Sequence, residues 1–384
     1  MSDRDPSLES AADDAARAGN VAEAARLLDR ATAADPGSAL LWAKLSAMRR
    51  ASGDVPGALA AIEGALGIDP LDFSALLARA LLLEKVGDAR SGEAFGHAIA
   101  QAPADDAIPI SMQAAVDRAR ERSAAYRAEL EATLQRAITP QLDRYSQERL
   151  ARFVSNSSRR TRTFHQEPTH FHFPGLPEIE FHDRAEFPGL DALEQEWEAI
   201  RAEFKVLLSA EATDMVPYIQ YPEQVPLRQW QELNHNRDWA AIHLIQNGLT
   251  ISAHAGHCPR TMTALSRLPQ PDVPGASPNA MFSMLAPRTR IPAHTGVANT
   301  RLVCHLPLIV PPGCGFRVGD TVREWREGEG FVFDDTIEHE AWNDSDQLRV
   351  VLIFDVWAPA LSEAERAAVA AIIPAAGVGF TGTL

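Results

Sequence analysis

Three histidines and one arginine in the C-terminal half of the sequence have types and spacings suited to a metal ion and an acidic small molecule. His294 follows a proline turn in PAHTG, His305 lies eleven residues later in RLVCHLPLIV, and His339 ends FDDTIEH. Arg349, ten residues beyond His339, opens RVVLIFDVW. Imidazoles are common ligands of transition metals, and a guanidinium binds a carboxylate through two parallel hydrogen bonds. We therefore predict a metal site with an acidic ligand beside it.

These residues lie in a region of short apolar runs separated by proline and glycine turns, from about residue 215 to residue 358. The runs are AMFSMLAP, TRLVCHLPLIV, GFRVGD, GFVFDD and LRVVLIFDVW, and they are typical of antiparallel strands in a sandwich or barrel. Alternation along a strand places Arg301 and Val303 on the same side as His305. In a double-stranded β-helix, an early and a late strand can bring two imidazoles together. A helical segment is predicted just before this region, at about 190–210.

A second group of histidines precedes the predicted helix. His165, His170 and His172 occur in FHQEPTHFHF and could be mistaken for metal ligands. However, His170 and His172 alternate with Phe171 and Phe173, as residues of a strand do. We interpret this group as structural.

The N-terminal third contains a repeat of 34 residues. The pairs Gly19-Asn20, Gly53-Asp54 and Gly87-Asp88 recur at that interval, and so do Asp35-Pro36 and Asp69-Pro70. Ala- and Leu-rich stretches lie between these markers, with small residues where two helices would cross closely. The period and the punctuation resemble tetratricopeptide repeats. The third unit is degenerate, and a charged run at about 111–138 predicts a solvated helix that caps the array.

Composition argues against nucleic-acid and membrane partners. The chain has 384 residues with 36 Lys and Arg against 52 Asp and Glu, a formal charge of −16, which repels phosphate backbones and anionic lipid surfaces. We see no secretory leader, and no apolar run approaches the roughly 20 residues that span a bilayer, so we expect a cytoplasmic protein. The cysteines Cys258, Cys304 and Cys314 form no C-x-x-C pair and predict reduced thiols.

From about Asp238 to Pro359 the sequence resembles the aspartyl/asparaginyl β-hydroxylase family of iron(II)- and 2-oxoglutarate-dependent oxygenases. The resemblance is carried by SMLAPRTRIPAHTG, NTRLVCHLPLIVPPGCGFRVG, REWREGEGFVFDDTIEHEAWND and LIFDVWAP. Animal members also carry helical repeats before the oxygenase domain. The resemblance implies an α+β multidomain protein with tetratricopeptide-like repeats at 1–106, a capping or linker helix at 107–140, and a jelly-roll, cupin-like oxygenase domain at 141–384.

The resemblance further implies that His294 and His339 bind Fe(II). Most related oxygenases add a carboxylate two residues after the first histidine, but Gly296 stands there, and this family leaves that position to water. Three acidic residues remain rival ligands: Asp334, Asp335 and Glu338. Asp335 could instead orient a ligand without touching the metal.

The cosubstrates implied by the resemblance are 2-oxoglutarate and O2. Arg349 would pair with the distal carboxylate of 2-oxoglutarate, Ser283 would hydrogen-bond the same end, and His305 would contact the carboxylate nearer the metal. Arg288 and Arg290 are alternatives for the role of Arg349. Fixed donors would hold the dicarboxylate while its 2-oxo acid end chelates iron.

The resemblance says less about the substrate than about the metal and the cosubstrate. The resemblance implies that Arg301 meets a substrate carboxylate, and we expect Trp239 to contact the substrate as well. Animal peptidyl-aspartate enzymes have a second arginine where this chain has Val303. We expect hydroxylation at the β-carbon of an Asp- or Asn-type residue in a peptide, a protein or a free amino acid. The repeats would either dock a peptide or protein substrate or only shield the oxygenase domain.

Other classes of function stay open. One is a repeat scaffold with an inactive β-roll, and another is a hydroxylase of a lipid or a different small molecule. A metal-dependent hydrolase or isomerase on a cupin-like barrel is a third class, and it usually needs three or four protein ligands. Iron-dependent conversion of 2-oxoglutarate to succinate would separate an oxygenase from the scaffold and the hydrolase.

Overall fold

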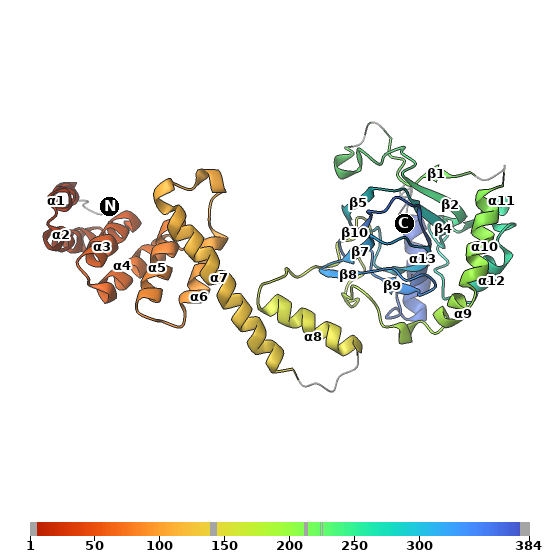
Figure 1. The fold of residues 1–384 in the computed structure, drawn as a ribbon, viewed down its shortest axis with the longest axis horizontal. Helices are drawn as coiled ribbons and strands as arrows, with labels where there is room; N and C mark the ends of the chain where they lie inside the picture. Colours follow the sequence, from red (N-terminus) through yellow and green to blue (C-terminus); the bar gives the residue numbers. More distant parts are fainter. Residues whose placement is uncertain (1–5, 139–143, 211–213, 223, 225, 377–384) are drawn as a thin grey trace. The chain divides into compact units, whose positions relative to one another are not determined.

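A computed structural model describes residues 6–138, 144–210, 214–222, 224 and 226–376 of the chain. The chain divides into two compact units, Met1–Thr161 and Arg162–Leu384. The first unit is helical and the second is built around β-sheets (Figure 1). The boundary lies at Thr161, whereas the sequence placed it at residue 140, because helix α8 (Arg144–Ser157) packs against helix α7 (Ile110–Arg136).

Three helical hairpins form most of the first unit. Their helices are α1 (Pro6–Arg17), α2 (Val21–Ala34), α3 (Ala39–Ala51), α4 (Val55–Ile68), α5 (Phe73–Lys85) and α6 (Ser91–Ala100). The turn inside each hairpin contains Gly19, Gly53 or Gly87, with φ of 78°, 86° and 70°, a backbone conformation that favours glycine. Each helix packs on the next one in the chain. The 34-residue repeat predicted from the sequence is therefore confirmed as a stack of hairpins.

Capping and close packing explain the remaining markers of the repeat. Asn20 and Asp54 cap α2 and α4 by accepting hydrogen bonds from the backbone N–H three residues on, which satisfies a free amide at the helix start. A Cβ atom on Gly64 would lie 2.8 Å from the Trp42 ring, so glycine lets α3 and α4 approach closely. In the third hairpin Asp88 does not cap α6; it bonds to Arg90 instead.

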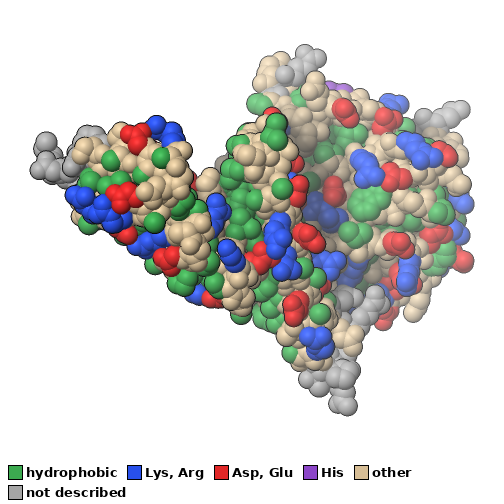
Figure 2. Space-filling model, turned by 60° about the vertical axis from the view of Figure 1, so that its left-hand side comes forward, with side chains coloured by type: hydrophobic (Ala, Val, Ile, Leu, Met, Phe, Trp, Pro, Cys, Tyr) green, Lys and Arg blue, Asp and Glu red, His purple; other side chains and the backbone are tan. Residues whose placement is uncertain are grey.

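The helix predicted at about 111–138 is present as α7 (Ile110–Arg136). A 3-10 turn, η1 (Asp105–Ala107), precedes it, and only Val116, Ala119 and Ser123 of its 27 residues are buried. Figure 2 shows basic and acidic side chains interspersed on the visible surface of the molecule, so the acidic excess does not form one patch on that face. No helix in the described part of the chain is both long and apolar enough to cross a bilayer.

Two antiparallel sheets organise the second unit. The larger sheet has the order β1-β2-β4-β11-β6-β9, with β3 paired to β2, and the smaller has the order β5-β10-β7-β8. The larger contains β1 (Val216–Pro217), β2 (Trp239–Gln246), β3 (Leu249–Thr250), β4 (Ala280–Leu285), β6 (Arg301–Ile309), β9 (Phe331–Phe333) and β11 (Arg349–Trp357). The smaller contains β5 (Thr289–His294), β7 (Cys314–Val318), β8 (Thr321–Arg323) and β10 (His339–Asn343). The five predicted apolar runs all lie in strands.

The larger sheet is covered on both faces. Its outer face packs against helices in one core cluster, which includes Ile242 and Phe282 (Figure 1). Its inner face meets the smaller sheet in a second cluster, which includes Met281 and Phe316. The helices are α9 (Leu190–Glu194), α10 (Trp197–Leu208), α11 (Ser252–Ala255), α12 (Pro259–Leu265) and α13 (Glu363–Ala375), with 3-10 turns η2 (Arg184–Glu186) and η3 (Arg228–Trp230). All polar residues discussed below as a site lie between the two sheets or at their ends.

Two local predictions need correction, and one is confirmed. The helix expected at about 190–210 is broken into α9 and α10. Residues 170–173 do not form a strand; Phe171 makes a single bridge to Ala298, because the segment runs along the edge of a loop and not along a sheet. The three cysteines are free and buried, as expected.

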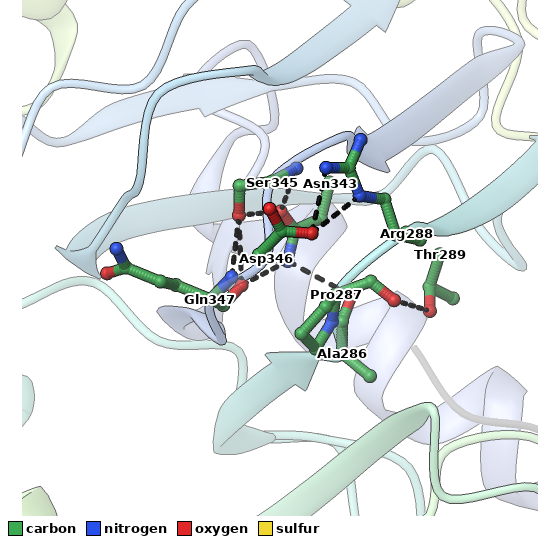
Figure 3. Close-up of polar contacts among 8 residues, drawn as sticks. All are labelled: Ala286, Pro287, Arg288, Thr289, Asn343, Ser345, Asp346 and Gln347. Carbon is green, nitrogen blue, oxygen red and sulfur yellow. Dashed lines mark hydrogen bonds and ion pairs between the residues drawn. The ribbon is translucent and has the colours of Figure 1, made fainter.

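A polar cluster around Asn343 ties the two sheets together at one rim (Figure 3). The buried Asn343 amide donates to the carbonyl oxygens of Leu285, Ala286 and Gln347 at 2.8–3.0 Å. The residues labelled in Figure 3 lie in or beside two turns. One turn joins β4 to β5 and the other joins β10 to β11. Because each turn joins a strand of the larger sheet to one of the smaller, the cluster holds four strands in a fixed relation.

Candidate active site between the two sheets

The centre of the site is a pair of histidines on neighbouring strands. His294 is the last residue of β5, His339 is the first of β10, and the two lie directly opposite each other in the ladder. Their ring centroids are 4.1 Å apart, with the planes inclined by 51°. The register shifts between His339 and Ala341, and such irregularities often re-aim side chains next to active sites. The predicted meeting of two imidazoles is therefore present in the structure.

Backbone carbonyls fix the tautomer of both rings. The Nδ1 atom of His294 lies 2.8 Å from the carbonyl oxygen of Pro292, and that of His339 lies 3.1 Å from the carbonyl oxygen of Ile337. A carbonyl only accepts, so each Nδ1 carries the proton and each Nε2 keeps its lone pair. Burial lowers the pKa of His294 to about 3 and that of His339 to about 4. Two neutral imidazoles oriented in this way fit the donor set of a transition metal.

A carboxylate does reach this site, but from a different part of the sequence than position 296. A Cβ atom built on Gly296 would lie 2.0 Å from Oδ2 of Asp335, so the Asp335 carboxylate fills the space that a side chain at 296 would need. The Gly296 N–H also donates to the Asp335 carbonyl at 2.7 Å. Oδ1 of Asp335 is buried without a hydrogen-bond partner. Across the residues that the structure describes, no set of three or more His, Cys, Asp or Glu is arranged to hold a metal.

The other two rival carboxylates are engaged elsewhere. Asp334 accepts hydrogen bonds from the backbone and hydroxyl of Thr336 at 2.9 Å and 2.6 Å and also bonds to Gln166. Glu338 is half-buried and pairs with Arg317 at 2.9 Å and with Arg162 at 2.8 Å. Of the three, only Asp335 lines the cavity that contains the histidine pair.

That cavity has a volume of about 50 Å³ and contains a buried arginine. Arg349 is 1% exposed, and no carboxylate within the described segments forms an ion pair with it. Its Nη1 lies 3.5 Å from Oγ of Ser283, its guanidinium carbon lies 4.8 Å from the Trp325 ring centroid, and its Nε has no partner. Burial lowers the pKa of Arg349 to about 10, so the group is still cationic at neutral pH. A buried charge without a counter-charge is costly, and an anionic ligand would remove that cost.

The same cavity brings in His305 and Trp239. Trp325 donates from Nε1 to Nδ1 of His305 at 3.3 Å, so the His305 proton lies on Nε2. Burial lowers the pKa of His305 well below its ordinary value, which makes it a neutral hydrogen-bond donor. Trp239 donates from Nε1 to Oγ of Ser283 at 3.2 Å. The structure thus brings together all five residues predicted to bind metal or 2-oxoglutarate.

The alternative arginines lie outside the cavity. Arg288 is exposed and pairs with Asp346 at 2.8 Å, as Figure 3 shows. Arg290 is exposed and pairs with Asp344 at 2.7 Å. Both are neutralised at the rim, which leaves Arg349 as the arginine of the cavity wall.

Comparison with known proteins identifies this part of the chain. Residues 194–359 match the model of the family described as Aspartyl/Asparaginyl beta-hydroxylase. The matched range contains the histidine pair, Ser283, His305 and Arg349. This segment is similar to the aspartyl/asparaginyl β-hydroxylase family.

Curated relatives match this hydroxylase-family segment and its surroundings. Human Aspartyl/asparaginyl beta-hydroxylase is 32% identical over 183 residues, 47% of this chain and 22% of that protein. Human Aspartate beta-hydroxylase domain-containing protein 2 is 31% identical over 207 residues, 53% of this chain and 54% of that protein. The Ornithine lipid ester-linked acyl 2-hydroxylase of Rhizobium tropici is 33% identical over 186 residues, 48% of this chain and 62% of that protein. Each match thus covers less than two thirds of the relative.

Two solved structures are each similar to about a third of the chain. The type III secretion chaperone SycD of Yersinia enterocolitica, in complex with a YopD peptide, aligns with 34% of this chain and 96% of its own at 17% identity, with a TM-score of 0.29. The TPR domain of Sgt2 from Aspergillus fumigatus aligns with 36% of this chain and 85% of its own at 19% identity, with a TM-score of 0.28. Scores this low carry no inference about function.

A second cavity of the hydroxylase-family segment contains Arg301. This cavity has a volume of about 170 Å³, and Tyr218 lines it as well as the smaller one. Arg301 is buried, and one of its terminal nitrogens lies 3.1 Å from Oδ2 of Asp335. Trp239, predicted to contact substrate, lines the smaller cavity and not this one. It stacks on Tyr218 with ring centroids 3.8 Å apart, so the two rings form a wall next to both spaces.

The site contains residues that sequence reasoning missed. Tyr218, Trp325 and His243 all line one of the two cavities, and none was singled out. Tyr218 follows a two-residue strand and Trp325 follows the short strand β8, where hydrophobic periodicity is too brief to read. His165 and His170 are exposed and bond to Glu178 and Thr169.

Proposed function

We propose that this protein is an Fe(II)- and 2-oxoglutarate-dependent hydroxylase. The observation that carries the proposal is Arg349, a buried guanidinium without a carboxylate partner, in the same small cavity as two neutral imidazoles. A dicarboxylate that also chelates metal would satisfy both features at once. The family of residues 194–359 supports β-hydroxylation in general. We further propose that the two sheets constitute a double-stranded β-helix.

His294 and His339 would hold the iron through Nε2, because Nδ1 of each ring is committed to a backbone carbonyl. Bound iron would supply the activation of O2 that is coupled to decarboxylation of 2-oxoglutarate. Asp335 would accept a hydrogen bond from a water at the metal, since its Oδ1 has no partner among the described residues. Its position next to Gly296 supports this role without direct ligation.

The remaining residues of the small cavity would orient 2-oxoglutarate. Arg349 would bind the distal carboxylate, and Ser283, held by the Trp239 indole, would donate its hydroxyl to the same end. His305 would donate from Nε2 to the carboxylate nearer the metal. Aromatic rings of Trp325 and Phe316 wall the cavity and would exclude water from the reacting groups.

On the substrate side, we propose hydroxylation at the β-carbon of an Asp- or Asn-type residue, with Arg301 as an anchor. We place this chemistry in the cytoplasm, in keeping with the three free cysteines. The helical repeats would dock a peptide or protein substrate. A second candidate is acyl hydroxylation, because one relative is named as an ornithine lipid acyl 2-hydroxylase.

The test measures cosubstrate turnover and product mass separately. The full-length protein is incubated with Fe(II), ascorbate, 2-oxoglutarate and a library of peptides, amino acids and acyl lipids. We expect succinate formation and a gain of one oxygen atom on an Asp- or Asn-containing compound. Oxygen gain only on an acyl chain would favour the second candidate.

Two variants decide whether the histidine pair is the metal site. His294→Ala and His339→Ala should each abolish succinate formation and weaken Mn(II) binding in equilibrium dialysis, while His165→Ala, at an exposed position, serves as the control. Full turnover in either cavity variant would overturn the metal assignment.

A further inference from the structure

The cavity that contains Arg301 has a composition unlike that of the cosubstrate cavity. Its volume is about 170 Å³, and an engineered cavity of about 150 Å³ holds a benzene molecule. Its wall combines apolar residues such as Met281 with side-chain amides such as Asn247. It therefore has room for one small polar group with its attached carbons. It meets the metal cavity at Tyr218 and at the Arg301–Asp335 pair.

Two buried side chains on this wall have nitrogen atoms that lack partners. Arg301 is 7% exposed and His243 is 8% exposed. Nη1 of Arg301 and Nδ1 of His243 have no hydrogen-bond partner in the described structure. Most buried polar groups in native proteins are satisfied, so two unsatisfied groups on one cavity wall indicate a ligand with complementary atoms.

The position of His243 follows from strand alternation. Trp239, Ala241 and His243 alternate along β2, and the first two lie in the core between the sheets. His243 pairs in register with Met281 on β4. Burial lowers the pKa of His243 to about 4, so the ring is neutral at physiological pH and can accept or donate one hydrogen bond.

The one arginine of this cavity wall already interacts with two carboxylates in the absence of a ligand. Arg301 is the only Lys, Arg, Asp or Glu among the described residues of the wall. Arg301 is paired with Asp335, and it also interacts electrostatically with Asp355. Asp355 is fully buried behind the wall, where it accepts hydrogen bonds from Ser277 at 2.9 Å and from the Asn279 backbone at 2.8 Å.

A second anion would therefore find no free cation here. Arg301 serves two carboxylates, and Val303, two residues along the same strand face, supplies no additional charge. Burying a further carboxylate would carry a desolvation cost with little compensation. A neutral amide costs less to bury than a carboxylate when its polar atoms find partners. Its acceptor oxygen and one of its two N–H donors match the two unsatisfied nitrogens.

We propose that the Arg301 cavity binds a neutral carboxamide of the substrate, with its oxygen accepting from Nη1 of Arg301 and its N–H donating to the His243 ring. This deepens the proposed function and rests on it, because it assigns the substrate as Asn-type and not Asp-type. Since the cavity adjoins the metal cavity, the carbon next to the amide would be the one presented to the histidine pair.

The test compares two probes that differ only in charge. N-acetylasparagine N-methylamide and N-acetylaspartate N-methylamide are titrated by NMR at pH 7.5 into the full-length protein loaded with Zn(II) and 2-oxoglutarate, and again into the metal-free protein. We expect the asparagine probe to bind at least tenfold more tightly in both. Equal affinity, tighter binding of the aspartate probe, or no binding of either at 20 mM would overturn the proposal.

Variants of the cavity wall identify the residue responsible. His243→Leu should remove most of the preference for the asparagine probe, and His243→Gln, which keeps a hydrogen-bonding group, should restore part of it. Leu249→Ala, at an exposed position on the neighbouring strand β3 and outside the cavity wall, is the control and should keep the full preference. If His243→Leu also keeps the preference for the asparagine probe, His243 does not contact the amide.

Binding of 2-oxoglutarate separates this proposal from the proposed function. If the protein fails to bind 2-oxoglutarate, the proposed function fails, while the probe preference of the metal-free protein still reports on the cavity. If 2-oxoglutarate binds normally and the amide preference is absent, only the assignment of an Asn-type substrate fails.

Discussion

The two units of this chain treat buried polar groups in opposite ways. In the helical repeats the few buried polar side chains are small and satisfied locally; for example, the hydroxyl of Ser46 donates to the Ala58 carbonyl at 2.8 Å. In the β unit, charged residues such as Arg349 and Asp355 are fully buried. Every unsatisfied buried side-chain nitrogen or oxygen found in the described residues belongs to the β unit.

This difference separates scaffold from site. Satisfied groups contribute to stability alone, whereas an unsatisfied buried group costs stability and persists where a ligand offsets the cost. Four of the residues with unsatisfied atoms line the two cavities: His243, Arg301, Asp335 and Arg349. We therefore expect ligands where several unmet hydrogen bonds gather on the wall of one cavity, as they do in these two cavities.

The largest expected effect on ligand binding comes from the unpaired arginine. Arg349→Met should weaken 2-oxoglutarate binding by at least about a hundredfold, because two charge-assisted hydrogen bonds are lost, equivalent to about 3 kcal/mol or more. Arg349→Lys should weaken it roughly tenfold, since it keeps the charge but not the planar fork. Isothermal titration calorimetry measures both.

The stability of the same variant sharpens the comparison. Arg349→Met should leave the free energy of unfolding of the ligand-free protein unchanged or raise it, since an uncompensated charge is removed. Arg79→Met in the repeats, which breaks an ion pair with Glu63, is the control and should not alter 2-oxoglutarate affinity. A strong loss of stability in Arg349→Met would show that the arginine is structural.

A substitution that creates a cavity in the repeat core should lower stability without changing cosubstrate binding. Phe95 is 0% exposed and packs in the core cluster of the last hairpins. Phe95→Ala should cost about 3–5 kcal/mol of stability in the helical unit and leave 2-oxoglutarate affinity unchanged. Urea unfolding followed by circular dichroism at 222 nm, which reports helix content, measures the stability. Isothermal titration calorimetry measures the affinity for 2-oxoglutarate. Loss of cosubstrate binding would show that the units are not independent.

Acid should destabilise the β unit through its buried histidines. The folded pKa of His243 is about 4, below the ordinary value of 6.5, so the unfolded chain binds a proton that the folded chain does not. The neutral His243 ring therefore contributes fully to the free energy of unfolding above pH 6.5. This contribution is lost as the pH falls from 6.5 towards 4. At pH 5 the loss is about 2 kcal/mol.

Urea unfolding at pH 8 and pH 5 checks this in the metal-free protein. The difference in stability between the two values should be smaller in His243→Leu than in the parent protein. His97→Leu, at a half-buried position in the repeats, is the control and should leave the difference unchanged. The same pH dependence in His243→Leu as in the parent would contradict the prediction.

The smallest effects come from a pair of glycine substitutions. Gly67→Ala in α4 meets nothing within 4 Å and should stabilise the helix by up to about 1 kcal/mol. Gly296→Ala must displace the Asp335 carboxylate, which lies 2.0 Å from the added atom. We expect it to weaken Mn(II) binding by roughly tenfold, about 1.4 kcal/mol, as measured by equilibrium dialysis. Unchanged metal affinity would mean that the Asp335 carboxylate has no part in the metal site.

Local signals in the sequence predicted the repeats and most strands. The Gly-Asn and Gly-Asp markers act within a few residues, through a left-handed backbone position and a helix cap, so their effect can be read directly from the chain. Strand predictions succeeded where apolar runs were long, as in β6 and β11. The break between α9 and α10 escaped prediction because apolar spacing continues across it.

For the candidate site, the sequence by itself determined which residue types are available and that His294, His305 and Arg349 lie on or beside strands. Only the tertiary structure decided which atoms meet. Asp335 occupies the space beside Gly296 because the loop before β10 passes there. One terminal nitrogen of the Arg301 guanidinium pairs with that carboxylate. His243 sits in an apolar run and carries no signal of its own, because burial and unmet hydrogen bonds are set by contacts between distant segments.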